Sequence, residues 1–361
     1  MSKKINAYAI VFGVVAAIII VAAISAYLSG SGTHAENLSL SNLKDYGPAP
    51  AIQGISAWIN SNAINLSSLR GKVVLLDFWT YSCINCIRTI PHLNAWYDKY
   101  GNNGLVIIGV STPEFGFEKN YSNVLSAVKR FGITYPVALD NNYSTWNAYH
   151  NQYWPADYLI GKNGNIREEQ LGEGNYAQTE RDIQALLANA SYSFNSTLTN
   201  ASLGVNFSDI HSPEMYLGYQ TASEHGTAIG NAEGFHPNQI VEYMPVNTVQ
   251  PNKPYFSGEW FNAPDSMVSF NNSRLILVYY ANKVNIVAGT AGTATKITIK
   301  LDGKSLNQTY LGADDRIVNG TAVAEINQSR LYNIVSAPSY GPHILEIDAN
   351  PAFRIYTFTF G

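Results

Sequence analysis

The feature that most constrains the fold is a largely apolar stretch, Lys72 to Trp79, that ends shortly before a pair of cysteines. Its length and composition are typical of a strand that is buried on both faces of a sheet. Residues Ile84 to Tyr100 then carry apolar side chains at helical spacing. A buried strand that leads directly into a helix predicts an α/β domain, with Cys83 and Cys86 where the helix begins.

The same texture continues over a first globular domain, residues 46–188. The pattern predicts a second buried strand, a helix, a short strand, a hairpin and a closing helix. These elements are expected at Leu105–Val110, Val124–Phe131, Tyr135–Leu139, Ala156–Ile160 with Asn165–Leu171, and Arg181–Leu187. A strand–helix–strand start followed by a hairpin indicates a sheet of mixed direction.

A second domain of different character follows. Residues 189–208 are rich in Asn, Ser and Thr and are typical of a linker. From residue 209 to 361 short strands alternate with turns, and Thr295 to Leu301 places apolar and polar side chains on opposite faces. This region is predicted to be an all-β sandwich.

The start of the chain predicts a membrane anchor. Lys3 and Lys4 precede an apolar run from Ala7 to Leu28, and about 22 residues of helix reach roughly 33 Å, enough to cross a bilayer. A cleaved signal peptide has a shorter apolar region, of roughly 7–15 residues. Residues 1–28 are therefore expected to be a transmembrane helix and 29–45 a tether. The remainder would be extracytoplasmic, where its many Asn-x-Ser/Thr sequons could be glycosylated.

Charge and cysteine content narrow the function. A net charge of −4 provides no basic field for phosphates, so nucleic acid is not an expected partner. The chain has only two cysteines, and a structural zinc site takes four ligands, so no metal is expected. A structural disulfide in so small a ring would stabilise the fold weakly. The cysteine pair itself is therefore the expected redox group, with no further cofactor.

The position of the cysteines predicts their roles. Amide groups and the dipole at a helix start are expected to lower the pKa of Cys83 and make it the nucleophile. Cys86 lies one turn further in, where it would stay protonated until it attacks a mixed disulfide. Asp77 on the preceding strand would lie beneath the pair and accept a proton from Cys86. The sequence thus predicts a thiol–disulfide oxidoreductase.

These residues resemble the active site of the thioredoxins. Asp77-Phe78-Trp79, the Cys83-x-x-Cys86 motif and Pro91 match the family's strand and kinked helix, and Trp154-Pro155-Ala156 resembles its cis-proline loop. The resemblance implies that Pro155 shapes a substrate groove. That groove would be lined by Trp79, Trp154, Ile84 and Asn85. Two further stretches, Gly71 to Val74 and Lys162 to Ile166, resemble the exported TlpA-like branch.

A closer resemblance, to the DipZ-type family, covers nearly everything after the anchor. The matching stretches are Trp79–Thr89, Thr112–Phe115, Ser212–Tyr219 and Phe358–Gly361. Such proteins join a CcdA-like electron-conducting membrane domain to a thioredoxin-like domain and a β-sandwich that resembles the carbohydrate-binding modules, so the resemblance implies a sandwich of that kind here. Here a single anchor is expected in place of the membrane domain, so the resemblance implies a separate CcdA-like electron donor. It also favours reduction of protein disulfides over oxidation.

Two other functions stay open at this point. Thr80-x-x-Cys83 fits the peroxide-binding motif of peroxiredoxins, although Leu76 stands where that motif has proline and a vicinal Cys86 suits disulfide exchange better. Alternatively, the protein is a glycan-binding surface protein with a vestigial redox domain. Trp260, Tyr216 and Tyr219 would then form an aromatic platform for a sugar, unless they are core residues of the sandwich.

Overall fold

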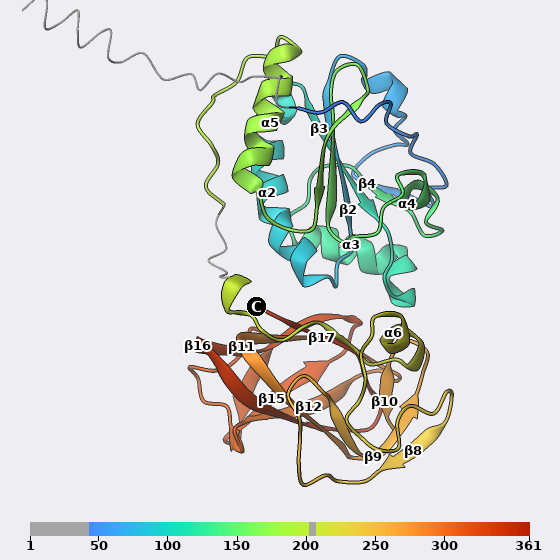
Figure 1. Ribbon diagram of the computed structural model, residues 1–361, viewed down its shortest axis with the longest axis vertical. Helices are drawn as coiled ribbons and strands as arrows, with labels where there is room; N and C mark the ends of the chain where they lie inside the picture. Colours follow the sequence, from blue (N-terminus) through green and yellow to red (C-terminus); the bar gives the residue numbers. More distant parts are fainter. Residues whose placement is uncertain (1–42, 202–206) are drawn as a thin grey trace, which may run out of the picture.

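The computed structural model describes residues 43–201 and 207–361, and its first half is built on a six-stranded sheet (Figure 1). The strand order is β1-β4-β3-β2-β5-β6. These strands are β1 (Trp58–Ile59), β2 (Val73–Trp79), β3 (Leu105–Ser111), β4 (Val137–Leu139), β5 (Ala156–Ile160) and β6 (Ile166–Leu171). β2, β3 and β4 are parallel, whereas β1, β5 and β6 run antiparallel to their neighbours. The predicted mixed sheet is confirmed.

Helices cover both faces of this sheet, which explains why β2 is buried along its whole length. The longer helices pack on one face and α4 on the other. They are α2 (Ile84–Tyr100), α3 (Tyr121–Arg130), α4 (Ser144–Ala148) and α5 (Tyr176–Asn189), with 3-10 turns at Leu66–Leu69, Gly101–Asn103, Gly116–Lys119 and Phe207–Asp209. α2 has the predicted bounds. α3 begins earlier than predicted because the Asn120 side chain accepts hydrogen bonds from two backbone N–H groups of its first turn.

The second half is almost entirely β structure. It contains one short helix, α6 (Tyr219–Glu224), that the sequence did not predict. The strands are β7 (Met215–Tyr216), β8 (Ile240–Tyr243), β9 (Tyr255–Asn262), β10 (Met267–Ser269), β11 (Ser273–Thr290), β12 (Thr295–Leu301), β13 (Lys304–Ser305), β14 (Asp315–Val318), β15 (Thr321–Ile326), β16 (Arg330–Ala349) and β17 (Phe353–Phe360). This half is called the β domain below.

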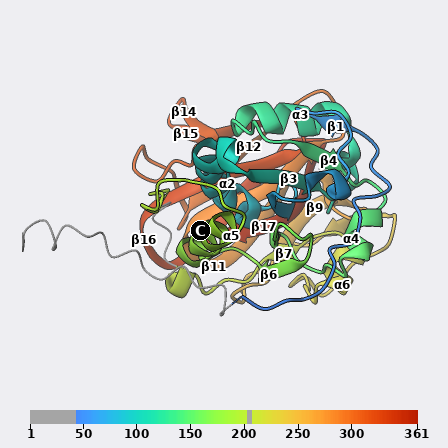
Figure 2. The same ribbon diagram turned by 90° about the horizontal axis from the view of Figure 1, so that it is seen from above.

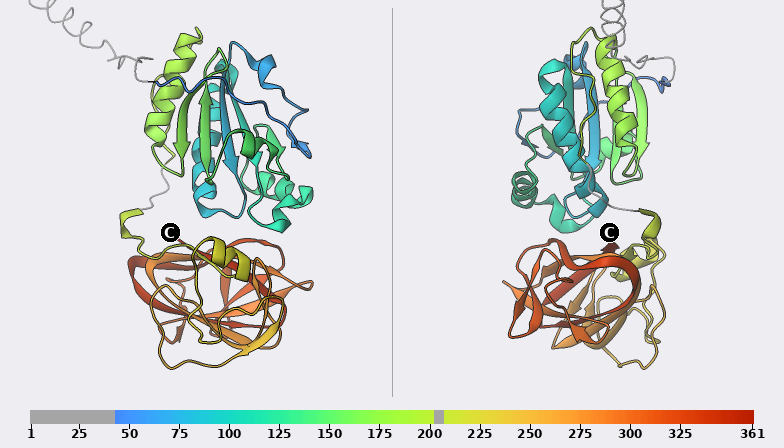
Figure 3. Two further views of the ribbon diagram at one scale, coloured as in Figure 1. Left: turned by 45° about the vertical axis from the view of Figure 1, so that its right-hand side comes forward. Right: turned by 90° about the vertical axis from the view of Figure 1, so that its left-hand side faces the viewer.

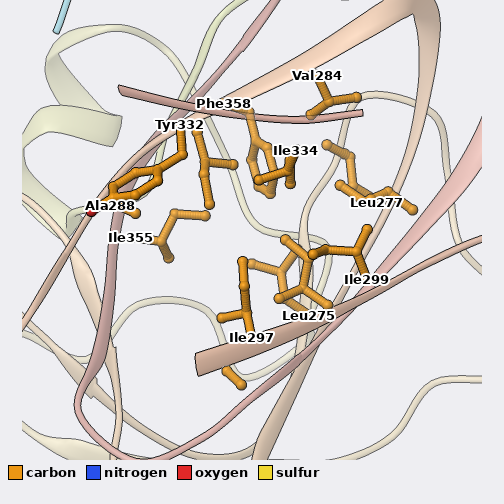
Figure 4. Packing of buried hydrophobic residues seen from close by; sticks show 14 of the residues in the cluster. Leu275, Leu277, Val284, Ala288, Ile297, Ile299, Tyr332, Ile334, Ile355 and Phe358 are labelled. Carbon is orange, nitrogen blue, oxygen red and sulfur yellow. The ribbon is translucent and has the colours of Figure 1, made fainter. Parts of the chain in front are cut away.

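The β domain is not built from two separate stacked sheets. Its strands form one hydrogen-bonded sheet of 11 strands, because the long strands β11 and β16 pair along most of their length and are interrupted by a register shift between Ala281 and Lys283. The first part of β11 also pairs with β9, and its last part pairs with β17. The sheet thereby folds around a single apolar core to which Leu277, Ile299 and Phe358 contribute (Figure 4).

The two halves meet at the end of the first sheet where α2 begins (Figure 3). Phe115 packs against Tyr356 of β17 with ring centroids 5.1 Å apart, and Arg88 of α2 donates a hydrogen bond to the carbonyl of Phe360 at 3.4 Å. The view along the long axis shows the first half lying directly over the β domain (Figure 2). The cysteine pair therefore lies on the side of the first domain that the β domain covers.

The predicted transmembrane anchor, residues 1–28, and most of the tether, 29–45, lie outside the described residues. Within 43–201 and 207–361, every helix is too short or too polar to span a bilayer. The predicted linker, 189–208, begins where α5 ends at Asn189.

Candidate redox-active site

Cys83 is the residue that caps the N-terminus of α2. Its Sγ accepts a hydrogen bond from the backbone N–H of Cys86 at 3.4 Å, as an N-cap side chain does. The two sulfurs also share a hydrogen bond, and both are free thiols in this structure. Cys86 is only 1% exposed, whereas Cys83 is half-buried. The structure thus brings the two sulfurs into contact, with Cys83 on the more accessible side.

The pKa of Cys83 is shifted in the opposite direction from the prediction. The hydrogen bond from Cys86 lowers it, but burial and the carboxyl groups of Glu114 and Glu214 raise it, and the raising effects prevail. The backbone N–H of Cys86 at the helix start lowers this pKa as predicted, but burial and the charges of two acids distant in sequence outweigh the effect. Burial raises the pKa of Cys86 well above its usual value, and contact with Cys83 adds to this. Cys86 is protonated, as predicted.

The proline loop faces the nucleophile. The Trp154–Pro155 peptide bond is cis, and the Cys83 thiol donates a weak hydrogen bond to the Trp154 carbonyl over 3.8 Å. The Trp154 indole in turn donates to the Thr112 carbonyl at 3.0 Å, which holds this loop against the end of β3. Pro155 is buried, so the loop presents backbone groups and not the proline ring at this position.

The remaining predicted groove residues divide into two groups. Ile84 and Asn85 are half-buried beside Cys83, and Asn85 accepts a hydrogen bond from Arg88 at 2.7 Å. The prediction that Trp79 lines the groove is wrong, because Trp79 is fully buried in the core beneath α2. A strand that is covered on both faces leaves its last tryptophan no access to a substrate.

Asp77 lies beneath the cysteines, and a second acid lies beside it. Asp77 is 1% exposed and pairs across β2 and β5 with Asp157, which is 6% exposed. Neither oxygen of Asp77 has a hydrogen-bond partner among the described residues, so two charged carboxylates at this place would face each other uncompensated. Burial raises the pKa of Asp77 to about 7, and burial together with the nearby charge raises that of Asp157 well above its usual range. The pair holds a proton at neutral pH.

A buried glutamate anchors the loop after β3 to the cysteine loop. Glu118 accepts a hydrogen bond from the Ser82 hydroxyl at 2.5 Å and from the backbone N–H groups of Glu114 and Phe115 at 2.6 and 2.9 Å. Ser82 directly precedes Cys83. The hydrogen bonds therefore tie the backbone of Glu114 to the residue that precedes the nucleophile.

The β domain also contacts Glu114, from the side opposite to Glu118. The Tyr216 hydroxyl donates a hydrogen bond to the Glu114 carboxyl group, and Tyr216 is itself buried against Phe115. Arg88 forms a two-pronged ion pair with Glu173, at 2.8 and 2.9 Å, and bonds the end of β17. Bidentate pairs of this kind hold their partners in a defined geometry. Groups of both domains therefore make up the surroundings of Cys83.

The predicted sugar platform is absent from the β domain. Trp260 is 0% exposed and lies in its core, and Tyr216 is buried at the contact with the first domain. Tyr219 is half-buried, and its hydroxyl accepts a hydrogen bond from Asn238. A pocket of about 470 Å³ does open on this domain. None of the described residues that line it is aromatic: Pro245, Ser257, Gly258, Asn272, Ser273, Arg274, Thr298, Asp348, Ala349 and Asn350.

Three acidic residues of the site were not predicted from the sequence. Asp157 is an isolated acid in an otherwise apolar strand two residues after the cis proline, and that contrast is a usable signal. Glu114 and Glu214 stand in stretches that resemble the DipZ-type family, but a chain separation of 100 residues gives no sign that they meet. Among the described residues, no group of three or more His, Cys, Asp or Glu side chains is arranged to hold a metal.

Comparison with known proteins divides the chain in the same way as the structure. Residues 48–169 match the AhpC/TSA family, and residues 212–361 match the "Thioredoxin like C-terminal domain" family. Protein DipZ of Mycobacterium bovis is 35% identical over 347 residues, which are 92% of this chain and 46% of that protein. The chain thus spans about half the length of the DipZ proteins it matches.

Other relatives cover the parts of the chain unequally. NHL repeat-containing protein 2 of Homo sapiens is 27% identical over 81% of this chain and 43% of its own length. Thiol-disulfide oxidoreductase ResA of Geobacillus kaustophilus is 32% identical over 34% of this chain and 67% of its own length. A solved thioredoxin-like protein in its oxidised form is 29% identical, with a TM-score of 0.37, over 39% of this chain and 95% of its own.

Because the carboxyl pair is buried, we expect Asp77→Asn to increase the free energy of unfolding by an amount that depends on pH. The raised folded-state pKa of Asp77, about 7, means that the native state loses stability as the pH rises from about 4, where the unfolded carboxyl ionises, to about 7. Removing this acid should therefore stabilise the protein at pH 7.5, by roughly 2–4 kcal/mol, and not at pH 4. Denaturant unfolding at the two pH values measures the difference.

Asp98→Asn is the matched control for this prediction. Asp98 is an exposed acid on α2, so its replacement should change the free energy of unfolding by less than about 0.5 kcal/mol at either pH. An Asp77→Asn protein that is destabilised equally at pH 4 and 7.5 would contradict the proton-sharing interpretation.

Proposed function

Because the chain belongs to the thioredoxin-like thiol–disulfide oxidoreductases and matches protein DipZ over 92% of its own length, we propose that it reduces protein disulfides through Cys83 and Cys86. One observation carries the proposal. A half-buried Cys83 thiol stands at the start of α2, in contact with the buried Cys86 thiol and facing the carbonyl of Trp154 in the cis-proline loop. A nucleophile, a resolving thiol and a backbone acceptor for an extended substrate are thereby together.

In the first step Cys83 loses its proton and its sulfur attacks one sulfur of the substrate disulfide. A bond forms between Cys83 and that sulfur, and the other substrate sulfur leaves as a thiolate that takes up a proton. The Trp154 carbonyl is available to accept a hydrogen bond from the substrate backbone once the thiol proton of Cys83 has gone.

In the second step Cys86 resolves the mixed disulfide. Its proton passes to the Asp77–Asp157 pair, which lies beneath it and can accept one, and its sulfur attacks that of Cys83. The bond between Cys83 and the substrate breaks, and the second substrate sulfur leaves as a thiolate that takes up a proton from the solvent, to which the aspartate pair releases the proton of Cys86. The products are a reduced substrate and a Cys83–Cys86 disulfide, so two electrons have passed to the substrate.

The raised pKa of Cys83 supports the direction of transfer. A strong oxidant such as DsbA has a nucleophilic thiol of very low pKa, which stabilises its reduced form. Here burial and the acids Glu114 and Glu214 outweigh the stabilising hydrogen bond from Cys86. A dithiol whose thiolate is disfavoured yields its electrons more readily, as a reductase requires.

We further propose a membrane-anchored, extracytoplasmic location, supported by the apolar run from Ala7 to Leu28 and the lysines before it. Electrons for re-reducing the disulfide would then come from a separate CcdA-like membrane protein. In the resembling family such a domain is joined to the thioredoxin-like part within one chain.

A thiol peroxidase is the second candidate, because residues 48–169 match the AhpC/TSA family. A peroxidatic site needs a cationic group directed at the peroxide beside the thiolate. Arg88, the arginine nearest to Cys83 along the chain, is instead engaged by Glu173, Asn85 and the Phe360 carbonyl. The disulfide reductase is therefore favoured.

Insulin reduction tests the proposed activity. Cys83→Ser should reduce the rate about 10³-fold or more, the scale on which loss of a nucleophile acts. Cys86→Ser should accumulate a mixed disulfide at Cys83 that mass spectrometry detects, whereas Asp98→Asn should behave as wild type. Equal rates in all four proteins would reject the redox function, and peroxide consumption that survives Cys86→Ser would favour the peroxidase.

The reduction potential of the pair tests the direction. Equilibration with glutathione or dithiothreitol should give a value near about −270 mV, as in reducing thioredoxins, and far from the −120 mV or so of strong oxidants. Glu114→Gln and Glu214→Gln should each make the potential less negative, because removing a negative charge favours the thiolate of the reduced form. A wild-type value near that of the oxidants would reverse the proposed direction.

Protease treatment of intact cells tests the location. The full chain should sediment with membranes and be digested by protease added outside, whereas a cytoplasmic marker protein should stay intact. A chain that is digested only after cell lysis would contradict the extracytoplasmic proposal.

A further inference from the structure

The loop that leads to Cys83 is bound by the β domain. The Tyr81 side chain is buried, and its hydroxyl lies 3.4 Å from the carbonyl oxygen of Ser329 and 3.5 Å from that of Phe117. Ser329 belongs to the turn between β15 and β16. The hydroxyl hydrogen is thus shared between a carbonyl of each domain, and the residue that donates it stands two positions before the nucleophile.

The turn between β15 and β16 is itself braced within the β domain. The Tyr332 hydroxyl donates to the Gln328 carbonyl at 2.7 Å and accepts from the Gln328 backbone N–H at 3.2 Å. The Arg330 guanidinium lies 3.7 Å from the centroid of the Tyr332 ring and forms an ion pair with Asp314 at 2.8 Å. The turn therefore presents its carbonyl to the first domain from a fixed position.

Two further contacts hold the β domain against the same end of the first domain. Arg88 of α2 donates a hydrogen bond to the carbonyl of Phe360, the last residue of β17, at 3.4 Å. The Tyr356 ring of the same strand packs on Phe115 and Phe117, with centroids 5.1 and 4.9 Å apart. The rings of Tyr356 and Phe115 are both buried. The β domain thus binds the cysteine loop, the start of α2 and the loop after β3.

The proline loop, in contrast, makes its contacts within the first domain. Asn151 holds Tyr153 through hydrogen bonds of 3.0 and 3.4 Å, and the Trp154 ring packs on Trp146 with centroids 4.2 Å apart. Within residues 43–201 and 207–361, the hydrogen bonds and ring contacts of Tyr153 and Trp154 all go to residues of the first domain. Tyr153 is 50% exposed. A substrate therefore has access to Cys83 along this loop.

These contacts restrict the shape of a molecule that can reach Cys83. An extended chain needs only about 4.8 Å beside its neighbour, and it can bond to the Trp154 carbonyl as an added strand does. A folded protein presents its disulfide within a broad surface, and a specific contact between two folded surfaces covers about 800 Å² on each. Such a surface would overlap the docked β domain before its disulfide came within bonding distance of the Cys83 sulfur.

We propose that docking of the β domain makes the enzyme selective for disulfides on extended, flexible segments, with Tyr81 and Tyr356 as the residues that position the domain. The inference rests on the proposed disulfide reductase and names the class of its substrates. A flexible segment passes between the proline loop and the β domain. A disulfide that lies flush with the surface of a folded protein is held away from Cys83. The bonds and protons exchanged are those of the two steps described above.

Two substrates that differ only in how one disulfide is mounted test the selectivity. A short peptide loop closed by a disulfide is joined to a folded carrier protein by a flexible tail, or is inserted flush with the carrier's surface. Each rate is divided by the rate with dithiothreitol, which corrects for the intrinsic reactivity of the disulfide. The full chain should prefer the loop on the tail by about tenfold or more in kcat/KM. Equal corrected rates would overturn the inference.

Tyr356→Ala and Tyr81→Phe test whether the β domain causes the preference. The first removes the ring that packs on Phe115, and the second removes the hydroxyl shared with Ser329. Tyr356→Ala should reduce the preference to about threefold or less, and Tyr81→Phe should reduce it by a smaller factor, because a buried ring stabilises a contact more than one long hydrogen bond. The preference compares two substrates of the same variant, so a general change in thiol reactivity cancels.

Matched controls lie elsewhere on the β domain. Phe270→Ala removes an exposed aromatic ring, and Tyr219→Phe removes a hydroxyl whose partner is Asn238. Both should keep the wild-type preference, and the same preference in Tyr356→Ala would overturn the part assigned to the β domain. The comparison of substrates in the wild type needs no variant to fold. A chain that reduces neither substrate would refute the reductase itself, whereas equal corrected rates in an active chain would refute only the selectivity.

Discussion

The junction between β2 and α2 is the constraint on which the rest of the site depends. β2 is buried on both faces and paired with β3 and β5, so its end cannot move independently of the sheet. α2 begins within the same turn of chain, with the Cys83 sulfur bound to the backbone of Cys86. The pairing of β2 with β5 then sets the proline loop opposite the helix start. One rigid frame thereby fixes both sulfurs and the carbonyl that faces them.

The two sulfurs of this frame have different acidic neighbours. Asp77 and Asp157 are buried opposite each other beneath Cys86, whereas the charges of Glu114 and Glu214 raise the pKa of Cys83. Burial and mutual repulsion favour retention of a proton by Asp77 and Asp157 at neutral pH. Disulfide exchange moves a proton when Cys86 attacks, so a proton-sharing pair beneath Cys86 matches the chemistry. The nearby acids also make both thiols harder to ionise, which is consistent with a dithiol that acts as a reductant.

Apolar periodicity and short motifs in the sequence predicted the burial of β2, the bounds of α2, the proline loop and the place of Asp77. The direction of the Cys83 pKa shift could not be predicted, because Glu114 and Glu214 meet only through packing of the two domains. Trp260 and Tyr216 were assigned to a surface platform for a similar reason: a β pattern states which residues share a face, but not whether that face is covered. The β pattern of the sequence also did not show that the bent strands β11 and β16 join the β domain into one sheet.

Burial of Tyr216 links docking of the domains to the chemistry of the thiol. While the β domain is docked through Phe115, Tyr356 and Arg88, the Tyr216 hydroxyl binds Glu114 and the charge of Glu214 acts on the Cys83 thiol. If the domains separated, Cys83 would lose one negative neighbour and gain water, and both changes lower a thiol pKa. The separated form would hold its thiolate more firmly and give up its electrons less readily. On this reasoning the β domain, which adds no redox group of its own, belongs to the catalytic unit because it maintains the poor ionisation on which reduction depends.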